Sequence, residues 1–339
     1  MTELPPLRIG IAGLGGHGRS IQDAVAAVPA LCVGAVYDPD EGEARAAADR
    51  FGCPAAPSFD ALLAHVDAVV LVTPNALHRA QTQAAVAAGL DVFVEKPIAN
   101  TVADGRAMVE AAEAAGRTLM VGHNMRFGAA MRWGREMIAA GRLGEVVSVE
   151  VHFSSDTGLR LSNASWRLRP DQCPLLPMMQ LGIHGVDLIH YLVGPIQSVF
   201  ARARAVTTTG GVVDSVVAAF DLTDGALGTM VSNYCTPVDF RVHIAGTEGA
   251  LGGTPAVLSF TPRADGEPET HDASADGYAS YAAQMQAFAD AVRGRTEPET
   301  HGWAGTQALA VVEAMADSIA RAASVEVPLL RPHALDHAS

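Results

Sequence analysis

Length, composition and charge exclude several classes of protein. The chain has 339 residues, about twice a typical single domain, so we expect two domains. A hydrophobic fraction of 49% against 18% charged residues excludes intrinsic disorder, and the aliphatic runs fall far short of the ~20 residues of a membrane-spanning helix. The formal net charge of −14 would repel phosphate backbones, so we expect no nucleic-acid partner.

Cysteine usage and the N-terminal segment bear on the compartment. Four cysteines lie far apart and form no CxxC pair, so we expect reduced thiols rather than a disulfide framework. The segment from Met1 to Leu7 lacks the basic start and apolar core of a secretory signal. We therefore expect a cytoplasmic protein with no membrane association.

The first half alternates apolar runs of strand length with alanine-rich stretches of helical spacing. The predicted strands are Leu7–Ala12, Leu31–Tyr37, Ala68–Val72, Val92–Val94 and Thr118–Val121. The predicted helices are Ile21–Val28, Glu41–Phe51, Leu77–Gly89 and Val102–Gly116, with Asn75 and Thr101 as N-caps of the last two. Strands that are apolar on both faces and joined by helices indicate a doubly wound parallel sheet, which we place in residues 1–126.

The second half, residues 127–339, predicts a different architecture. Its predicted helices are Ala129–Ala140, Met178–Leu192, Tyr278–Val292 and Trp303–Ala323. Its predicted strands are Val146–Phe153, Ser198–Thr207, Ser215–Leu222, Leu227–Asn233, Phe240–Ala245 and Val325–Leu329. Consecutive strands joined by short turns indicate an antiparallel sheet, and the stretch Arg263–Gly277 is predicted to be an exposed loop. We allow for the C-terminal helices packing back on the first domain.

A glycine motif follows the first predicted strand. It consists of Gly13-Leu14-Gly15-Gly16-His17-Gly18, and a predicted helix comes next. In such a turn the first glycine permits the tight bend, Gly15 admits a pyrophosphate to the backbone, and Gly18 allows close helix packing. The phosphates would then bind at the helix N-terminus. The motif predicts a dinucleotide site, and its alternative is a glycine-rich turn without a ligand.

Asp38 ends the second predicted strand and discriminates between two dinucleotides. Its carboxylate can accept hydrogen bonds from the adenosine ribose hydroxyls and would repel a 2′-phosphate. No Arg or Lys follows it before Arg45 to neutralise that phosphate. We therefore expect NAD rather than NADP; the alternative is that Asp38 merely caps the next helix.

Lys96 follows the fourth predicted strand, within Glu95-Lys96-Pro97. Ligands of open parallel sheets bind beyond the carboxyl ends of the strands. A lysine there can hydrogen-bond a reacting hydroxyl and ease its deprotonation. The alternative is an exposed Lys-Pro at a strand end.

His184 and Asp187 are three residues apart on a predicted helix and so share one of its faces. Histidine is the natural proton acceptor near neutral pH, although a core or capping histidine is the alternative. His190 lies about 240° around the helix from His184, so we expect no metal site here.

These motifs together resemble the Gfo/Idh/MocA family, which includes glucose–fructose oxidoreductase and inositol dehydrogenase. The resemblance rests on the glycine turn, Asp38, Thr73-Pro74-Asn75 with His78, Glu95-Lys96-Pro97 and residues 182–187. It implies an α/β chain with an N-terminal Rossmann domain and a C-terminal α/β domain. The large, mainly antiparallel open sheet of the latter commonly forms the oligomer interface, so we expect a homodimer or homotetramer.

The resemblance also implies two groups of site residues. Lys96 would contact the substrate hydroxyl and His184 would exchange its proton. The other substrate-side candidates are Arg126, Trp166, Gln180 and Asp187. The cofactor-binding candidates are Gly13, Leu14, Gly15, His17, Gly18, Asp38, Thr73, Pro74, Asn75, His78, Glu95, Lys96, Trp166 and Arg167.

Gln180 departs from the pattern of the family. Many relatives place Asp four residues before the histidine, where this chain has an amide. A carboxylate would stabilise an imidazolium, whereas an amide supplies only hydrogen bonds. We therefore expect a weaker base, a proton passed on through water or Asp187, or an amide that orients a sugar hydroxyl.

The leading hypothesis is an NAD-dependent oxidoreductase that moves a hydride between nicotinamide and a secondary alcohol or ketone of a sugar, inositol or related polyol. Two alternatives stay open. One is a catalytically silent protein of the same fold that senses a sugar or nucleotide. The other is a reductase similar to dihydrodiol dehydrogenase.

Overall fold

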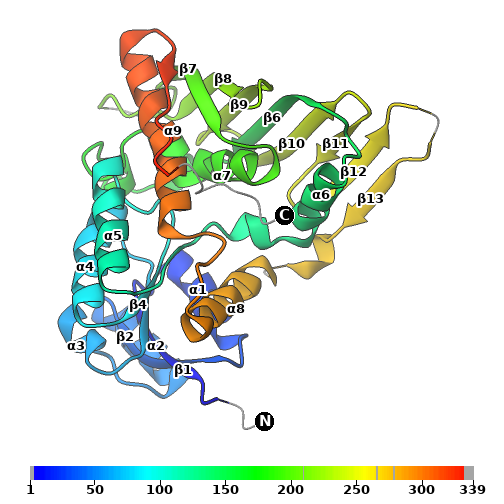
Figure 1. The fold of residues 1–339 in the computed structure, drawn as a ribbon. Coiled ribbons are helices and arrows are strands. Elements are labelled where there is room, and N and C mark those ends of the chain that lie inside the picture. The colour runs from blue at the N-terminus through cyan, green and yellow to red at the C-terminus, as the bar shows by residue number, and fades with distance from the viewer. Residues whose placement is uncertain (1–3, 209, 265, 278, 332–339) are drawn as a thin grey trace. The chain divides into compact units, whose positions relative to one another are not determined.

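The computed structural model describes residues 4–208, 210–264, 266–277 and 279–331, which form two compact units (Figure 1). Unit 1 is formed by the described residues within Met1–Asn124 and Tyr278–Gly305. Unit 2 is formed by those within Met125–Gly277 and Thr306–Ser339.

Unit 1 is built on a five-stranded parallel sheet of order β2-β1-β3-β4-β5. Its strands are β1 (Leu7–Ala12), β2 (Leu31–Tyr37), β3 (Ala68–Leu71), β4 (Asp91–Val94) and β5 (Leu119–Val121). Strands β3, β4 and β5 are buried along their whole length, as expected of a parallel sheet covered on both faces. The predicted Rossmann sheet is thereby confirmed. Its strand order reverses between β1 and β3, which is where such sheets bind ligands.

The helices of unit 1 depart from the prediction mainly at their ends. They are α1 (His17–Ala26), α2 (Glu41–Phe51), α3 (Phe59–Leu63), α4 (His78–Ala87), α5 (Val102–Ala114) and α8 (Ala279–Gly294). The N-cap Thr101 is confirmed, since its hydroxyl accepts from the N–H of Asp104. The N-cap Asn75 is wrong, because a 3₁₀ turn (Asn75–Leu77) precedes α4 and buries the Asn75 side chain. Helix α1 begins at His17, inside the glycine motif and earlier than predicted, and the predicted first residue of α8, Tyr278, lies outside the described residues.

Unit 2 is built on a nine-stranded sheet of order β13-β12-β11-β10-β6-β9-β8-β7-β14. Only the neighbours β6 and β9 run parallel, so the prediction of a large, mainly antiparallel sheet is confirmed. The strands are β6 (Val146–Ser154), β7 (Ile196–Arg204), β8 (Ser215–Leu222), β9 (Leu227–Asn233), β10 (Asp239–Gly246), β11 (Gly249–Gly253), β12 (Val257–Pro262), β13 (Glu269–Asp272) and β14 (Val325–Glu326).

One edge of this sheet is not predicted from the sequence. The stretch Arg263–Gly277, predicted to be an exposed loop, contains β13, which pairs with β12. Strand β11 carries three glycines in five residues and β13 is entirely polar, so neither shows the pattern of a strand. Pairing with neighbouring strands, rather than local propensity, extends the sheet here.

One face of the sheet in unit 2 is buried and the other is exposed. Residues alternate between buried and exposed along β8, for example. Helices α6 (Ala129–Ala139) and α7 (Ile183–Leu192) pack on the buried face, and α9 (Gly302–Arg321) begins in unit 1 and continues in unit 2. The exposed face presents apolar side chains at Phe200, Val217 and Leu227, which are 39%, 50% and 59% exposed.

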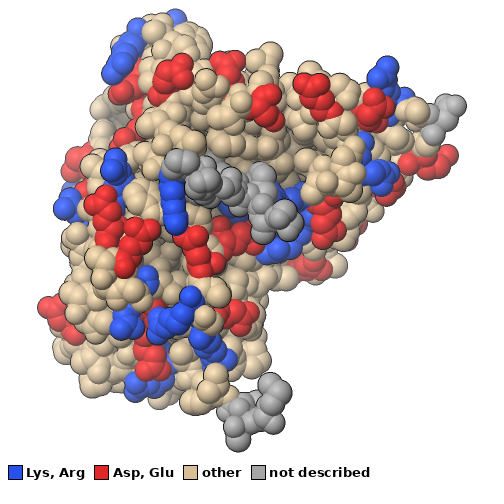
Figure 2. All heavy atoms as spheres, in the orientation of Figure 1, with Lys and Arg blue, Asp and Glu red and all other residues tan. Residues whose placement is uncertain are grey.

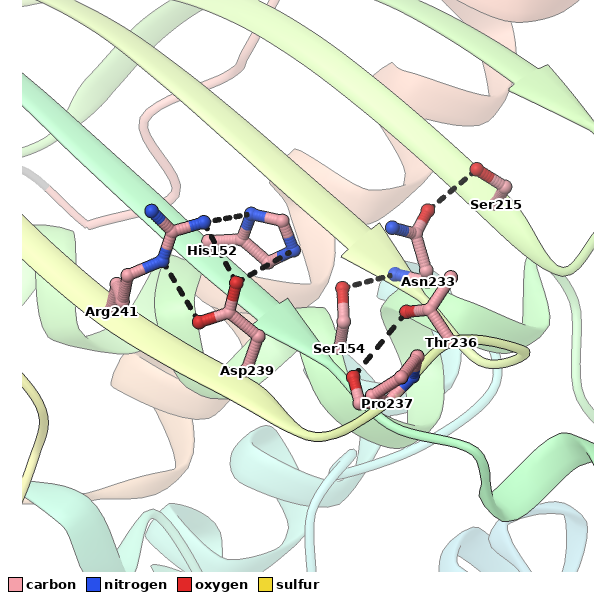
Figure 3. Close-up of polar contacts among 8 residues, drawn as sticks. All are labelled: His152, Ser154, Ser215, Asn233, Thr236, Pro237, Asp239 and Arg241. Carbon is pink, nitrogen blue, oxygen red and sulfur yellow. Dashed lines mark hydrogen bonds and ion pairs between the residues drawn. The ribbon is translucent and has the colours of Figure 1, made fainter.

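Polar side chains occupy another part of the exposed face. Arg241 of β10 donates to both oxygens of Asp239, at 2.8 and 2.7 Å, and lies 3.2 Å from Nδ1 of His152 on β6 (Figure 3). A hollow of about 620 Å³ opens beside them on the same sheet. Elsewhere on the surface, acidic and basic side chains are interspersed on the side of the molecule that Figure 2 draws.

Candidate cofactor and active site

The glycines of the turn after β1 have two different roles, one in the fold and one in ligand access. Gly13 has a φ of +90°, and a Cβ there would lie 2.5 Å from the carbonyl oxygen of Val72. A Cβ on Gly18 would lie 2.3 Å from the carbonyl oxygen of Gly13, so α1 could not approach the turn. At Gly15 the nearest atoms, in the Glu43 side chain, would be 3.7 Å from a Cβ, which is an ordinary contact. The fold therefore requires Gly13 and Gly18, whereas Gly15 leaves room for a ligand to reach the backbone.

Alanine at these two kinds of glycine is expected to separate stability from cofactor binding. Gly18→Ala creates a backbone clash and should lower the free energy of unfolding by about 1–3 kcal/mol. Gly15→Ala should leave unfolding unchanged but weaken dinucleotide binding by about tenfold or more, because its methyl group takes the space of the pyrophosphate. Denaturant titration and NADH fluorescence measure the two effects. Unchanged NADH affinity in Gly15→Ala would contradict this assignment.

Asp38, at the end of β2, is hydrogen-bonded to the glycine turn. Its Oδ2 accepts a hydrogen bond from the backbone N–H of Leu14 at 2.7 Å, and its Oδ1 accepts one from Asp40 at 2.9 Å. Helix α2 is capped by Asp40, whose side chain accepts from Gly42 and Glu43, so the helix-cap alternative for Asp38 is wrong. The carboxylate of Asp38 is thus held next to the glycine turn, at the point where the strand order reverses.

His78 joins the turns that follow β3 and β4. Its Nε2 lies 2.9 Å from the carbonyl oxygen of Thr73, and its Nδ1 lies 3.0 Å from that of Pro97. Burial of the ring lowers the pKa of His78, although the neighbouring carbonyl groups act in the opposite direction. An imidazole held between two turns positions both of them, and this suits a support beneath the predicted cofactor turn Thr73-Pro74-Asn75.

Asn75 supplies a buried donor in that turn. Its side chain is 4% exposed, and its Nδ2 has no hydrogen-bond partner among the residues that the structure describes. Buried amide donors are nearly always satisfied, so this one, beyond the carboxyl end of β3, suits an acceptor that a ligand supplies. The acceptor oxygens of a dinucleotide fit it.

Glu95 connects the glycine turn with Lys96. Its Oε1 lies 3.4 Å from Nε2 of His17, the first residue of α1, and its Oε2 accepts from the N–H of Lys96 at 3.1 Å. Burial would raise the pKa of Glu95, but His17 and Lys96 together hold it below its usual value. Gly122 makes room for this carboxylate, since a Cβ there would lie 2.7 Å from Oε1. The predicted phosphate-binding turn and the predicted catalytic lysine are therefore parts of one cluster.

Lys96 is the only lysine among the 23 Lys and Arg residues of the sequence. It follows β4 and is half-buried, and its peptide bond to Pro97 is cis. An ammonium is a compact charge that can lose its proton in a suitable site, whereas a guanidinium stays protonated. Among the Lys and Arg residues of the chain, only this one, at the carboxyl end of β4, is therefore suited to proton-coupled chemistry.

In unit 2, His184 is placed by a helix that lies close to the sheet. The π-helical turn Met178–Gly182 runs directly into α7, whose second residue is His184, and this histidine is 8% exposed. A Cβ on Gly185 would lie 2.5 Å from the Cε of Met230 in β9, so the glycine permits the close approach. The helix predicted over Met178–Leu192 is confirmed, and it fixes the imidazole against the core of the unit.

Asp187 and Arg126 form a buried ion pair. The Nε and one terminal nitrogen of Arg126 donate to the two carboxylate oxygens at 2.8 and 2.7 Å. Both side chains are at most 6% exposed, and the guanidinium lies over the ring of Tyr191. Each oxygen of Asp187 thus already accepts from Arg126, so a proton relay through Asp187 would have to disturb this pair. The pair has a clear structural role, whereas its predicted contact with substrate stays a prediction.

Gln180 is oriented by two neighbours. Its Oε1 accepts from Nε of Arg167 at 2.8 Å, and its Nε2 lies 3.4 Å from Sγ of Cys173. The guanidinium carbon of Arg167 lies 4.8 Å from the centre of the Trp166 ring. The structure therefore brings together three of the predicted unit 2 residues, Trp166, Arg167 and Gln180, around a single guanidinium group.

Three neighbours of these residues are not predicted from the sequence. The ring of Tyr281 lies edge-on to His17 with centroids 5.6 Å apart, and Cys173 contacts Gln180. Tyr234 is buried, which raises its pKa, and the charge of Arg167 acts in the opposite direction. Neither periodicity nor a motif links Tyr281 to residue 17 or Tyr234 to residue 167, so only tertiary contacts reveal them.

Metal-binding clusters and membrane-spanning helices are both absent from the described part of the chain. Within it, no group of three or more His, Cys, Asp or Glu side chains is arranged to hold a metal ion. None of its helices has the length and apolar character needed to cross a membrane.

Comparison with protein families matches both halves of the chain. Residues 7–123 match the profile described as "Oxidoreductase family, NAD-binding Rossmann fold", and residues 131–252 match that of the "GFO/IDH/MocA C-terminal domain". The first of these ranges contains the glycine turn, Asp38 and Lys96, and the second contains His184.

Individual relatives extend over most of the chain. It is 32% identical over 280 residues to the 1,5-anhydro-D-fructose reductase of Ensifer adhaerens, a match that covers 78% of this chain and 81% of that protein. It is 30% identical over 335 residues to the D-xylose 1-dehydrogenase (NADP(+)) 2 of Haloferax volcanii, covering 95% and 100%. Among solved structures, the WlbA dehydrogenase of Bordetella pertussis in complex with NADH and UDP-GlcNAcA matches with a TM-score of 0.87 and 27% identity, covering 96% and 98%.

Proposed function

The chain is an oxidoreductase of the Gfo/Idh/MocA family, and we propose that it transfers a hydride between NAD and a secondary alcohol or ketone of a sugar, inositol or related polyol. The observation that carries this proposal is the cluster of unit 1, in which the buried carboxylate of Glu95 contacts His17 of the glycine turn and the backbone N–H of Lys96. Relatives named as reductases and dehydrogenases of sugars support the substrate class.

The proposed mechanism assigns one task to each reacting side chain. When bound, the nicotinamide accepts or supplies the hydride. Lys96 holds the substrate oxygen and stabilises the negative charge that develops on it. His184 accepts the hydroxyl proton in the oxidative direction and returns it in the reductive direction. The family resemblance adds Trp166 and Arg167 as further predicted contacts of the cofactor.

A direct assay tests this function. The protein is incubated with NAD and a panel of sugars and polyols while the absorbance of NADH is followed. We expect NADH to form with at least one panel member. Binding of NAD and a sugar without any turnover, in either direction, would favour the catalytically silent sensor instead.

Asp38 supports NAD as the preferred dinucleotide, although one relative is named for NADP(+). Its carboxylate would lie where NADP carries a 2′-phosphate, and the next cation along the chain is Arg45. We expect tighter binding of NAD than of NADP. Asp38→Asn, which keeps an acceptor for the N–H of Leu14 but removes the charge, should narrow the ratio of the two dissociation constants by about tenfold.

Asp40→Asn is the matched control for this comparison. It removes the same charge two residues away at an exposed helix cap. Tighter NADP binding by the unmodified protein, or equal shifts in the two variants, would contradict the role of Asp38.

The exposed sheet face of unit 2 is the proposed surface for a homodimer or homotetramer. Its apolar side chains, Phe200, Val217 and Leu227, would gain burial from a second copy of the face. Val217→Glu places a charge in this surface and should reduce the molar mass measured by analytical ultracentrifugation to that of a smaller assembly. An unchanged mass in the variant, or a monomeric unmodified protein, would contradict the proposal.

A further inference from the structure

Helix α8 carries a fully buried amide that is unpaired in the described part of the chain. Gln284 is 0% exposed, and neither its Oε1 nor its Nε2 has a hydrogen-bond partner among the described residues. The other members of the buried stripe of α8 are apolar: Met285, Phe288, Ala289, Ala291 and Val292. Buried amides are nearly always satisfied, and an apolar side chain of the same size would avoid the cost of leaving one unpaired. A glutamine in this stripe therefore points to a role other than packing.

Helix α8 lies along the face of β4 that leads to Glu95. The side chains of Asp91, Phe93 and Glu95 share this face, because the N–H of Glu95 still bonds to the last residue of β3 and the alternation of the strand extends to it. The rings of Phe93 and Phe288 have centroids 5.8 Å apart, and Asp91 accepts from Arg295, just beyond the end of α8. The helix and the strand therefore run in opposite directions along this face.

Gln284 lies at the level of Glu95 in this arrangement. It is four residues before the phenylalanine of α8, which is about 6 Å along the helix axis. Glu95 is two residues beyond the phenylalanine of β4, which is about 7 Å along the strand. Tyr281, three residues before Gln284 and on the same side of α8, has its ring 5.6 Å from that of His17, whose Nε2 lies 3.4 Å from Oε1 of Glu95. Both routes place the amide beside the carboxylate.

The Oε1 of Glu95 is the atom that this amide can serve. Glu95 is 4% exposed, and its Oε2 already accepts from the N–H of Lys96. Oε1 has no hydrogen-bond partner among the described residues and only the longer contact with His17. A bridging water molecule joins polar groups that lie beyond direct hydrogen-bond distance, and it needs two to four polar partners. The carboxylate oxygen and both ends of the Gln284 amide can supply them.

We propose that Gln284 is a positioning residue for the reaction: its amide holds the Glu95 carboxylate through a bridging water molecule, and Glu95 in turn fixes the backbone of Lys96. This inference rests on the proposed function, because it treats Lys96 as the residue that contacts the substrate. The charged or titratable groups that act on Glu95 are His17 and Lys96, and Glu95 itself acts on His78. A change at residue 284 leaves these three partners in place and alters one contact of Glu95.

Gln284→Met separates positioning from packing. Methionine has nearly the volume of glutamine and is apolar, so the urea midpoint of unfolding should stay the same or rise. We expect kcat to fall by about tenfold, because Lys96 is held less firmly. The acid limb of the pH profile of kcat/KM should move to higher pH, since the loss of a hydrogen bond to the charged form raises the pKa of Glu95.

Gln286→Met is the matched control. It makes the same replacement two residues further along α8, where the amide donates to Asp290 at 2.8 Å on the exposed side of the helix. Neither kcat nor the pH profile should change. Gln284→Glu is a second variant of unchanged size. It sets a carboxylate against that of Glu95, and because two such groups share a proton, the acid limb should move further than in Gln284→Met.

A further readout requires no turnover. Lys96 is the only lysine, so the rate at which an amine-directed reagent modifies it at pH 8, followed by peptide mass spectrometry, reports on its surroundings. In Gln284→Met this rate should rise by about threefold, because a Glu95 carboxylate that is held less firmly stabilises the ammonium less. The rate in Gln286→Met should match that of the unmodified protein. Altered labelling in a protein that turns over no sugar or polyol would overturn the proposed function but uphold the inference.

Two results would overturn the inference itself. One is a Gln284→Met variant whose kcat, pH profile and labelling rate all match those of the unmodified protein, or a Gln284→Glu variant without a shift of the acid limb. The other is a Gln284→Met variant whose urea midpoint falls while its pH profile and labelling rate stay the same, which would assign Gln284 to packing alone.

Discussion

Replacing Lys96 with Met or His184 with Ala is expected to lower kcat by about 10³-fold in each case, because each removes a group that stabilises charge or moves a proton in the transition state. The dissociation constant for NAD should stay nearly the same, since the glycine turn and Asp38 are intact in both variants. Steady-state kinetics and NADH fluorescence measure the two quantities separately. Retained turnover in both variants would remove these residues from the mechanism.

Because the chain has a single lysine, two further measurements can test the role of Lys96. Lys96→Arg keeps the positive charge but replaces the ammonium with a larger, permanently protonated group, so we expect it to stay about as inactive as Lys96→Met. Because Lys96 is the only lysine, an amine-directed reagent can modify no other side chain of that type. Modification should abolish turnover, and bound NADH should slow it. Full activity after complete modification of Lys96 would contradict its role.

Breaking the buried pair of unit 2 is expected to have the largest effect on stability. Arg126→Met leaves Asp187 as a buried charge without its bidentate partner, and should lower the free energy of unfolding by about 3–5 kcal/mol. The double variant Arg126→Met with Asp187→Leu should recover most of that loss, because it removes both charges. Urea denaturation followed by circular dichroism measures each value.

An exposed ion pair on α9 supplies the control. Asp317→Asn breaks the ion pair between Asp317, which is 58% exposed, and Arg321, which is 65% exposed. This change should alter the free energy of unfolding by about 1 kcal/mol at most. Asp187→Asn separates structure from catalysis. If it lowers turnover while stability stays unchanged, Asp187 takes part in proton transfer and the structural assignment is wrong.

Sequence motifs identify some residues of the candidate site, but not the contacts between them. The glycine spacing, Asp38 and Lys96 could be assigned from sequence because each stands directly after a strand, and parallel strands bring their carboxyl ends to one edge. The contact of Glu95 with His17 could not, since it joins residues far apart in the chain through side-chain geometry. For Gln180 the sequence indicated a tuner of His184 or a contact for a sugar hydroxyl, whereas the structure shows its amide engaged with Arg167 and Cys173.

The amino-acid sequence by itself determined the fold class, the alternation of strands and helices in the first half and the family to which the chain belongs. These features depend on local periodicity and on short motifs, which a chain carries before it folds. Only the tertiary structure decided that glycine-rich β11 and polar β13 extend the sheet, that Asp187 is paired with Arg126, and that Arg167 has no carboxylate partner among the described residues. Such features arise from pairing and burial between distant segments, and no local pattern encodes them.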